Sequence, residues 1–415
     1  MLYDLAVIGG GAAGLAAAVS AARAGERVLV LEAGSAVGKK ILASGNGRCN
    51  LMNTGKLRYY GDTDFAGRVL QKCGAGEQAQ FWRGIGLITV ADAENRTYPV
   101  TFHSASVLGV LKSALQMNGV SVVLNAAVSE CGVTPDRIFR MEAAGAEYKS
   151  RRMLVATGGP AGRKQDGLIS GYEILRRFGH RIIPLRPALV PMTAETRGIS
   201  GLSGIRVRCG VTLIDPDNKP VFREHGELLF TDYGVSGICA MQCGRFIGKP
   251  GYRLELDLVR DIFGDEDSLK KEIRFRKTLF AALSPEVMLT GMLQARLSYA
   301  VMKQAGLALR GETAGDLDEE RLDRIAWVLR HYRIGITGTR GMEDAQVTAG
   351  GAECGEFNPE NMESGIVPGL YAAGEIMNVD GDCGGYNLMF AFGSGILAGL
   401  DGKLPAAENR GGIHP

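Results

Sequence analysis

Residues 3–32 read YDLAVIGGGAAGLAAAVSAARAGERVLVLE, and this stretch decides the fold class. A short, mostly apolar run at 3–8 predicts a buried strand that stops at a glycine cluster. The alanine-rich segment to Arg23 predicts a helix, and residues 27–32 predict the next strand. Together they form a βαβ unit of about thirty residues with parallel strands. The sequence therefore predicts an α/β protein with a Rossmann-like parallel sheet.

The glycine cluster carries a dinucleotide-binding pattern. Gly9, Gly11 and Gly14 satisfy GxGxxG between a strand and a helix, where glycines permit a tight turn, a close pyrophosphate and close helix packing. Glu32 ends the next strand and is predicted to accept hydrogen bonds from an adenosine ribose, which disfavours a 2′-phosphate. A glycine-rich turn without a ligand is the alternative. The pattern does not separate NAD from FAD, because both contain an ADP half.

A second glycine-rich block lies near the C-terminus. Residues 369–375 read GLYAAGE and predict a strand that ends at glycine and an acid, and Asp380 and the sequence Gly384-Gly385-Tyr386-Asn387 follow. Residues 388–400 predict a buried helix. A glycine pair before a helix lets backbone approach a flat ring, and the positive end of the helix stabilises negative charge on a reduced flavin. This block therefore favours FAD, with a structural turn as the alternative.

The third block, at residues 38–50, reads GKKILASGNGRCN. It follows the strand that ends at Glu32, and so it is expected at the carboxyl edge of the sheet, where ligands bind in open α/β folds. Lys40 and Arg48 could serve phosphates or the flavin pyrimidine edge, and Asn50 could bond a ring heteroatom. A solvated loop with incidental charges is the alternative.

The rest of the chain indicates a nucleotide-binding domain that is interrupted. Residues 104–119 predict a helix, residues 120–124 a strand, and residues 127–150 a small antiparallel meander. A return strand is expected at 153–156. The predicted parts are a first FAD-binding portion at 1–187, an inserted β-barrel at 188–264, a helical insert and return at 265–344, and a C-terminal FAD-binding portion at 345–415.

The amino-acid composition argues against several classes of protein. Glycine takes 59 of 415 positions, about twice the usual share of roughly 7%, and its lack of a three-residue period excludes collagen. The formal net charge of +2 gives no basic footprint for nucleic acid or for an anionic membrane. No apolar stretch is long enough to predict a transmembrane span, and Met1 is expected to be the mature start. Eight cysteines without a CxxC pair favour reduced thiols in a cytoplasm and offer no metal site.

Several motifs resemble the BaiN/YhiN-like family of NAD(P)/FAD-dependent oxidoreductases. The resemblance rests on the motifs at 38–50, 154–159, 224–237, 345–364 and 374–399, which occur in the order typical of that family. It implies a non-covalent FAD protein with a discontinuous Rossmann-like domain, an inserted β-barrel and a helical lid. Met52, Asn378 and Gly393 stand where the family usually has Thr, often has Asp, and usually has Ser. None of these departures removes a glycine that the dinucleotide needs.

The resemblance also implies a set of FAD contacts across the chain. These are Gly9, Gly11, Ala12, Ala13, Gly14, Glu32, Ala33, Lys40, Gly45, Gly47, Arg48, Cys49, Asn50, Val128, Thr157, Gly158, Gly374, Glu375, Asp380, Gly385, Tyr386, Asn387 and Leu388.

No catalytic residue is assigned from the sequence. Cys49 could be a redox thiol beside the flavin, but it lacks a resolving partner, and a packing role is favoured. Cys239 and Cys243 have helical spacing that two small buried hydrophobes explain. His225 and His331 could be proton donors, although a lone histidine is more often structural.

The predicted function is an FAD-dependent oxidoreductase with hydride transfer through the flavin. NAD(P)H is the expected transient reductant, because a second GxGxxG after a strand is missing. The resemblance implies a small organic substrate of the enone or oxo-steroid type, with no nucleic acid or membrane partner and no indication of oligomeric state. Two alternatives stay open: a flavin-dependent RNA-modifying enzyme and a non-enzymatic flavin redox sensor.

Overall fold

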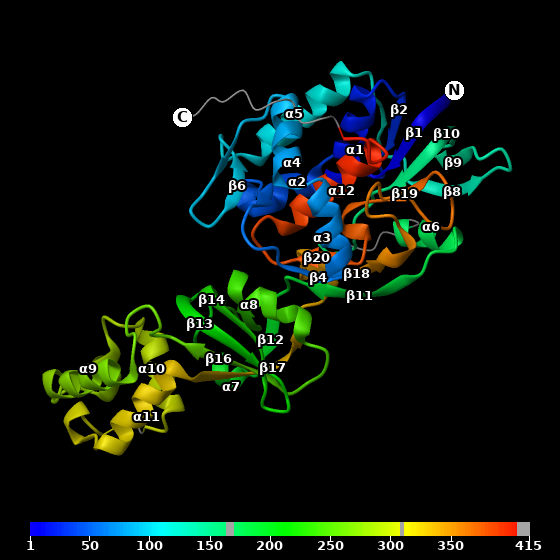
Figure 1. Cartoon of the computed structure of the whole chain (residues 1–415). Helices are drawn as coiled ribbons and strands as arrows, with labels where there is room; N and C mark the ends of the chain where they lie inside the picture. The colour runs from blue at the N-terminus through cyan, green and yellow to red at the C-terminus, as the bar shows by residue number, and fades with distance from the viewer. Residues whose placement is uncertain (163–169, 308–310, 405–415) are drawn as a thin grey trace. The chain divides into compact units, whose positions relative to one another are not determined.

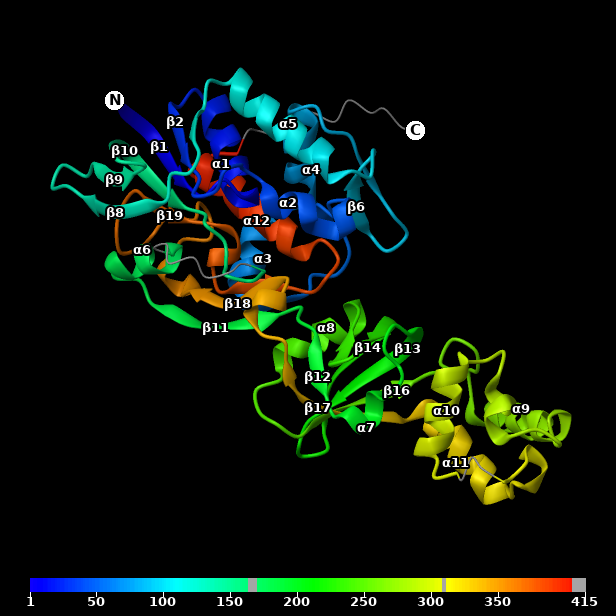
Figure 2. The same cartoon turned by 180° about the vertical axis from the view of Figure 1, so that it is seen from behind.

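The computed structural model describes residues 1–162, 170–307 and 311–404. Its internal contacts divide the chain into two compact units. The first unit comprises Met1–Arg186 and the described residues from Val347 onward, and the second comprises Pro187–Gln346. Figure 1 and the reverse view in Figure 2 show the elements of each unit. In the part of the chain that the structure describes, no helix is both long and apolar enough to cross a membrane.

The first unit is built on a Rossmann-like sheet with strand order β7-β2-β1-β10 and with β19 on the far side of β10. The strands are β1 (Leu2–Ile8), β2 (Val28–Leu31), β7 (Ser121–Val123), β10 (Ala146–Val155) and β19 (Leu370–Ala372), and their pairings are parallel. The βαβ prediction is confirmed: Leu5 pairs with Val28 in β2 and with Arg152 in β10. These strands read as continuous apolar runs because helices cover both faces of a parallel sheet.

A single strand spans the positions of two predicted strands. The predicted strands at 145–150 and 153–156 are a single strand, β10, whose first half pairs antiparallel with β9 (Phe139–Ala143) and whose second half pairs parallel with β1. Arg151 and Arg152 interrupt the apolar pattern, yet the strand continues through them. Arg152 is accommodated because it binds Glu26 and donates to the carbonyl of Ala398 at 3.2 Å. The meander is completed by β8 (Val128–Val133), as predicted.

Two helices that lie far apart in the sequence cross closely in this unit. Helix α1 (Ala12–Arg23) packs on β1 and β2 and contacts both α5 (Ser104–Met117) and α12 (Tyr386–Gly399). A Cβ at Gly395 of α12 would lie 2.3 Å from the carbonyl oxygen of Ala13, and one at Gly399 would lie 2.4 Å from that of Ala17. The glycines therefore permit a crossing at backbone contact distance. The buried C-terminal helix is confirmed, and it begins two residues earlier than predicted.

Smaller elements complete the first unit. A three-stranded sheet has the order β3 (Met52–Asn53), β6 (Arg96–Pro99) and β5 (Thr89–Ala91). Strand β4 (Tyr59–Gly61) pairs with β20 (Val379–Gly381), and β11 (Ile182–Ala188) pairs with β18 (Val347–Ala352). The short helices are α2 (Lys39–Ala43), α3 (Thr63–Lys72), α4 (Ala75–Gly84) and α6 (Gly171–Arg177).

The second unit contains the predicted barrel and helices. Six antiparallel strands close in the order β12-β15-β14-β13-β16-β17, with bounds Met192–Ala194, Gly234–Ser236, Pro220–Phe230, Arg206–Ile214, Tyr252–Asp257 and Tyr332–Thr339. Its helices are α7 (Thr196–Ile199), α8 (Ile238–Cys243), α9 (Glu266–Leu279), α10 (Ala295–Gln304) and α11 (Glu319–Arg330). The last three precede β17, so the helical insert lies between two neighbouring barrel strands. The predicted fold class is confirmed.

Candidate functional site

The GxGxxG loop has the geometry that each glycine position predicts. Gly9 has φ +106°, and a Cβ there would lie 2.6 Å from the carbonyl oxygen of Ala156 in the neighbouring loop. A Cβ at Gly14 would lie 2.0 Å from the carbonyl oxygen of Gly9, so only glycine allows α1 to pack against the turn. At Gly11 the nearest atom is 4.0 Å away. The loop is therefore crowded on the protein side and open at its second glycine, where a pyrophosphate would lie.

Helix α1 leaves donors at its first turn. Its N-cap is Gly11, and the first helical hydrogen bond runs from the Leu15 N–H to the Gly11 carbonyl at 2.9 Å. The N–H groups of Ala12, Ala13 and Gly14 precede that bond and carry the positive end of the helix dipole. The sequence places no acidic side chain in this turn. The predicted contacts Ala12, Ala13 and Gly14 therefore form one anion-binding helix end.

Glu32 is held by backbone donors beside this loop. Its Oε2 accepts from the Gly10 N–H at 2.8 Å, and its Oε1 accepts from the Gly34 N–H at 2.7 Å. Its backbone carbonyl accepts from the Ala126 N–H at 2.8 Å, which brings the start of β8 near. Val128, two residues further, is buried, whereas Ala33 is exposed. The residues predicted to bind the adenosine half thus lie together at the carboxyl ends of β1 and β2.

Lys40 and Glu375 join the second and third blocks. The Lys40 ammonium lies 2.7 Å from Glu375 Oε2, and Glu375 Oε1 accepts from the Thr348 N–H at 2.9 Å. Gly158 also belongs to this cluster, since a Cβ there would lie 3.6 Å from Glu375 Oε2. The hydroxyl of Thr157 lies 3.4 Å from the carbonyl oxygen of Gly158. Four predicted contacts from three distant segments are therefore neighbours.

The loop at 44–50 is wound tightly. Gly45 and Asn46 are both left-handed, and Cys49 has φ +58°. The Arg48 side chain is exposed, and in the described residues it has no hydrogen bond or ion pair; Gly47 has open space around it. Burial raises the pKa of the Cys49 thiol to about 11, and a hydrogen bond with Ser44 offsets part of that shift. Cys49 is thus a neutral thiol near pH 7 rather than a reactive thiolate.

Asn50 is a buried polar group that faces the C-terminal glycine pair. Within the described chain its Oδ1 has no hydrogen-bond partner, although the residue is only 8% exposed. A Cβ at Gly385 would lie 2.6 Å from this oxygen and 2.7 Å from the carbonyl carbon of Met52. An orphaned buried amide oxygen costs free energy unless a bound group donates to it. Asn50 and Gly385 together therefore suit a ligand with a ring N–H group that donates to Asn50 Oδ1.

The start of α12 repeats the arrangement at α1. Gly385 is the N-cap with φ +103°, and the first helical bond runs from the Met389 N–H to the Gly385 carbonyl at 2.9 Å. The N–H groups of Tyr386, Asn387 and Leu388 precede that bond. The N-terminus of α12 therefore presents backbone N–H donors, as that of α1 does. Helix α12 is the longer of the two helices.

Not every predicted side chain is free for a ligand. The Asn387 amide closes its own loop, because it accepts from the Gly381 N–H and donates to the Gly381 carbonyl, both at 2.8 Å. The Tyr386 hydroxyl donates to the carbonyl of Lys56 at 3.0 Å. Asp380 is buried in β20, where it pairs with Tyr60 of β4. The side chains of Asn387 and Tyr386 therefore shape the loop, and the backbone N–H groups in the first turn of α12 are what they leave for a cofactor.

Three supporting residues were missed by the sequence interpretation. The Ser394 hydroxyl accepts from the Gly374 N–H at 3.0 Å, and Asn53 donates to the Gly384 carbonyl at 3.0 Å. Thr348 holds Glu375, as described above. Only Ser394 gives a sequence signal, because it is a polar residue inside an otherwise apolar segment; Asn53 lies in a mixed segment, and Thr348 acts through its backbone N–H.

The assembled site fits FAD. Two helix N-termini, an unoccupied acceptor on Asn50 and a carboxylate at Glu32 match a molecule with a pyrophosphate, a ring N–H and a ribose. When bound, FAD supplies hydride transfer. The chain itself contributes the N–H donors of α1, the ion pair of Lys40 and Glu375, and the close approach of backbone at Gly385. In the described residues no group of three His, Cys, Asp or Glu side chains could hold a metal ion.

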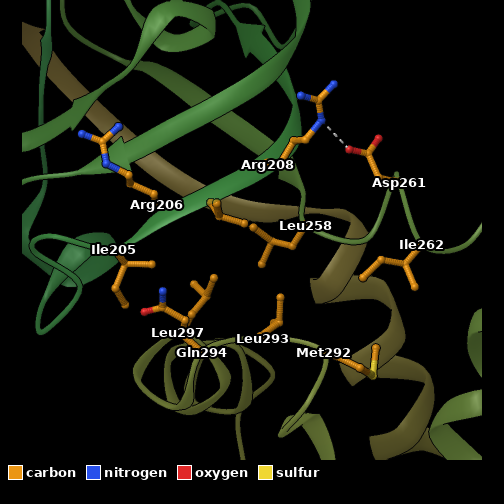
Figure 3. A pocket seen from close by; sticks show the side chains of 11 residues that line it. Ile205, Arg206, Arg208, Leu258, Asp261, Ile262, Met292, Leu293, Gln294 and Leu297 are labelled. Atoms are coloured by element: carbon orange, nitrogen blue, oxygen red, sulfur yellow. Dashed lines mark hydrogen bonds and ion pairs between the residues drawn. The ribbon is translucent and has the colours of Figure 1, made fainter.

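The second unit holds the two histidines considered above. His225 Nε2 lies 2.8 Å from Asp261 Oδ1, and His331 Nδ1 lies 2.8 Å from Glu255 Oε1. Asp261 also binds Arg208 and lines a pocket of about 350 Å³ between β13 and the helices (Figure 3). Cys239 and Cys243 are buried on α8, and burial raises the pKa of Cys239 to about 12. The geometry gives all four residues structural partners within this unit.

Comparison with known proteins identifies the family. A family model described as HI0933-like protein Rossmann domain matches residues 3–401. The 3-dehydro-bile acid delta(4,6)-reductase of Clostridium scindens is 32% identical over 405 residues, which cover 95% of this chain and 98% of that protein. Ribosomal RNA dihydrouridine synthases of Escherichia coli and Haemophilus influenzae are 29% and 27% identical; the alignments cover 96% and 95% of this chain and 98% and 97% of theirs. The chain therefore belongs to the HI0933-like family, a family of flavoprotein oxidoreductases, as its motifs predicted.

Proposed function

We propose that this protein is an FAD-dependent reductase of a carbon–carbon double bond conjugated to a carbonyl, in a small apolar molecule of the oxo-steroid type. The observation that carries the proposal is the similarity to the bile-acid reductase, which spans nearly the full length of both chains. The convergence of the three glycine-rich blocks supports it from the structure. NAD(P)H is the proposed reductant and docks transiently, because the chain has no second GxGxxG after a strand.

The proposed cofactor contacts follow the geometry of the site. The N–H groups of Ala12, Ala13 and Gly14 bind the pyrophosphate, and Glu32 binds the adenosine ribose. Asn50 and the first turn of α12 bind the edge of the flavin ring, where the helix end stabilises negative charge. Lys40 is held in place by Glu375 at 2.7 Å and adds a cation at the same edge of the sheet.

Purified protein tests the proposal directly. We expect a flavin absorbance spectrum, anaerobic bleaching by NADH or NADPH, and reoxidation by a 3-oxo-Δ4 steroid with the product reduced at the double bond. Protein that lacks flavin and does not take up FAD would overturn the proposal. Rapid bleaching with no oxidation by any enone, and with no turnover of a dye acceptor, would favour a redox sensor instead.

A second candidate is a flavin-dependent RNA-modifying enzyme, which the names of two relatives favour. The near-neutral charge of the chain counts against it, since RNA-binding surfaces are basic. Mass spectrometry of ribosomal RNA from cells with and without the gene distinguishes the two candidates. Loss of a dihydrouridine in the deleted strain, restored by the gene, would establish the RNA activity, and unchanged RNA would exclude it.

A further inference from the structure

An exposed apolar surface lies on the β5–β6 hairpin of the first unit, at the edge of the proposed cofactor site. We call it the hairpin face and define it by Ile88, Val90, Tyr98, Val100 and Phe102. Ile88 is 70% exposed, Val100 53% and Phe102 45%. Large exposed side chains that gather on one small element, rather than being scattered, mark a binding surface.

The register of the hairpin places these side chains together. Val90 pairs with Tyr98, and the Val100 N–H donates to the Ile88 carbonyl at 2.9 Å. Because side chains two residues apart on a strand share a face, these four side chains lie on the same face of the hairpin. The rings of Tyr98 and Phe102 lie 5.6 Å apart. On the opposite face, Thr97 and Pro99 are buried. The hairpin thus packs Thr97 and Pro99 inward and leaves its apolar face exposed.

Phe102 is held in a costly backbone conformation. Its φ of +51° lies in the left-handed region, where a bulky side chain is a genuine outlier. A hydrogen bond from its N–H to the Pro99 carbonyl at 2.8 Å fixes the turn. Such strain is concentrated at functional sites. Here the strain displays an aromatic ring to solvent, which packing of the fold does not explain.

The hairpin face continues directly into the cofactor site. Strand β6 pairs with β3, where Asn53 lies opposite Arg96. Asn53 also donates to the carbonyl of Gly384, the residue between Cys383 and Gly385. Burial raises the pKa of Tyr98, and the nearby cations of Arg96 and Arg48 offset part of that shift. The Leu51 N–H donates to the Thr97 carbonyl at 2.8 Å, so the loop that holds Arg48 leads directly to β6, next to Tyr98.

We infer that the hairpin face binds the hydrocarbon skeleton of the substrate, a flat apolar molecule whose carbonyl lies at the end nearest Arg48 and Tyr98. This inference rests on the proposed function and adds to it the surface and the orientation. The apolar end of the substrate covers Ile88, Val100 and Phe102. The oxygen end meets Arg48, a cation without a partner in the described residues, and the Tyr98 hydroxyl. The hairpin and the turn before Gly385 are thus linked through Asn53, which pairs with Arg96 and bonds the Gly384 carbonyl.

Binding to the flavin-loaded protein tests the inference without reference to turnover. The probe is 4-androstene-3,17-dione, titrated while the flavin absorbance is recorded. The variants Ile88→Ser and Phe102→Ser remove apolar side chains that are already exposed, so both should fold. Met117→Ser is the control, because Met117 is 85% exposed on α5 and lies outside the hairpin face. We expect at least a tenfold rise in Kd for both hairpin variants, with flavin content and bleaching by NAD(P)H unchanged.

The outcomes separate this inference from the proposed function. Steroid binding that equals wild type in both hairpin variants would overturn the hairpin face while leaving the proposed reaction standing. Steroid binding that depends on the hairpin, with no reduction of any enone by the wild type, would overturn the reaction and leave the binding surface standing. Loss of a dimer in sedimentation, with steroid binding unchanged, would show instead that the face joins two copies of the chain. Absence of steroid binding in the wild type would overturn both.

Discussion

At the residue scale, Gly385 and Asn50 form the contact on which the flavin end of the site depends. Gly385 has φ +103°, and a side chain there would meet Asn50 Oδ1 at 2.6 Å. We expect Gly385→Ala to reduce FAD affinity at least tenfold and to lower the free energy of unfolding by about 1–3 kcal/mol. FAD titration and urea unfolding measure the two effects.

A helical glycine with free space is the matched control. Gly67 lies in α3, and a Cβ there meets nothing within 4 Å. Gly67→Ala should therefore stabilise the protein by roughly 0.5–1 kcal/mol through helix propensity and leave FAD binding unchanged. Equal effects of the two substitutions would show that the strain at Gly385 is unimportant.

The raised pKa of the Cys49 thiol should make the free energy of unfolding fall with pH in the alkaline range. Burial raises the pKa of the folded-state thiol to about 11, above its ordinary value of about 9, so the folded state retains a proton that the unfolded state loses. The contribution is fully present below pH 9 and is lost as the pH rises towards 11, on the order of 2 kcal/mol. Cys49→Ala should therefore show a shallower fall in unfolding free energy between pH 9 and pH 11 than wild type. Parallel curves would contradict the assignment.

At the element scale, the packing of α12 against α1 fixes the positions of the N-termini of both helices relative to each other. Gly395 contacts the Ala13 carbonyl, and Gly374 packs against Ala13 as well. We expect Gly395→Val to cost about 1–3 kcal/mol by overpacking and to weaken FAD binding, because displacing α12 separates its first turn from Asn50. Thermal unfolding with and without FAD measures both.

A glycine on another helix provides the comparison for this crossing. Gly109 lies in α5 with nothing within 4 Å of its Cβ position, so Gly109→Ala should be neutral or stabilising. If Gly395→Val kept wild-type FAD affinity, the crossing would not position the cofactor.

The elements that could be predicted from sequence are those whose pattern is local. The strand at residues 3–8, the GxGxxG loop and the first helix follow from apolar periodicity and glycine spacing. Helices α3 and α4 and the β5–β6 hairpin were not predicted, although the buried residues Phe65, Ala66, Val69 and Leu70 of α3 follow a helical spacing that the sequence already shows. The bond from the Tyr386 hydroxyl to the Lys56 carbonyl and the close approach of Gly385 to the Asn50 oxygen join segments more than 300 residues apart, which no local pattern encodes.

At the scale of the whole molecule, the chain leaves and re-enters the first unit along paired strands. Near their ends the Gln346 N–H donates to the Leu189 carbonyl at 3.0 Å, and the Glu353 N–H donates to the Arg181 carbonyl at 2.9 Å. We therefore expect that replacing residues 187–346 by a short glycine-serine turn yields a folded protein that binds FAD. FAD at a hundred times its Kd should stabilise it by about 2.7 kcal/mol.

Thermal unfolding with and without FAD, together with far-ultraviolet circular dichroism, checks this expectation. A shortened chain that is folded but unresponsive to FAD would show that the cofactor needs the second unit. A chain that does not fold would show that the first unit does not fold independently of the second.

The pairing of β10 with β19 has a consequence for biosynthesis. Met153 lies beside Leu370 in the central sheet, so a nascent polypeptide displays an unpaired inner edge at β10 while more than two hundred further residues are translated. Long-range strand pairing of this kind slows the acquisition of the native state. A prematurely terminated product lacks both the strand that seals this edge and the helix that completes the cofactor cradle. We therefore expect a polypeptide that ends before α12 not to retain FAD.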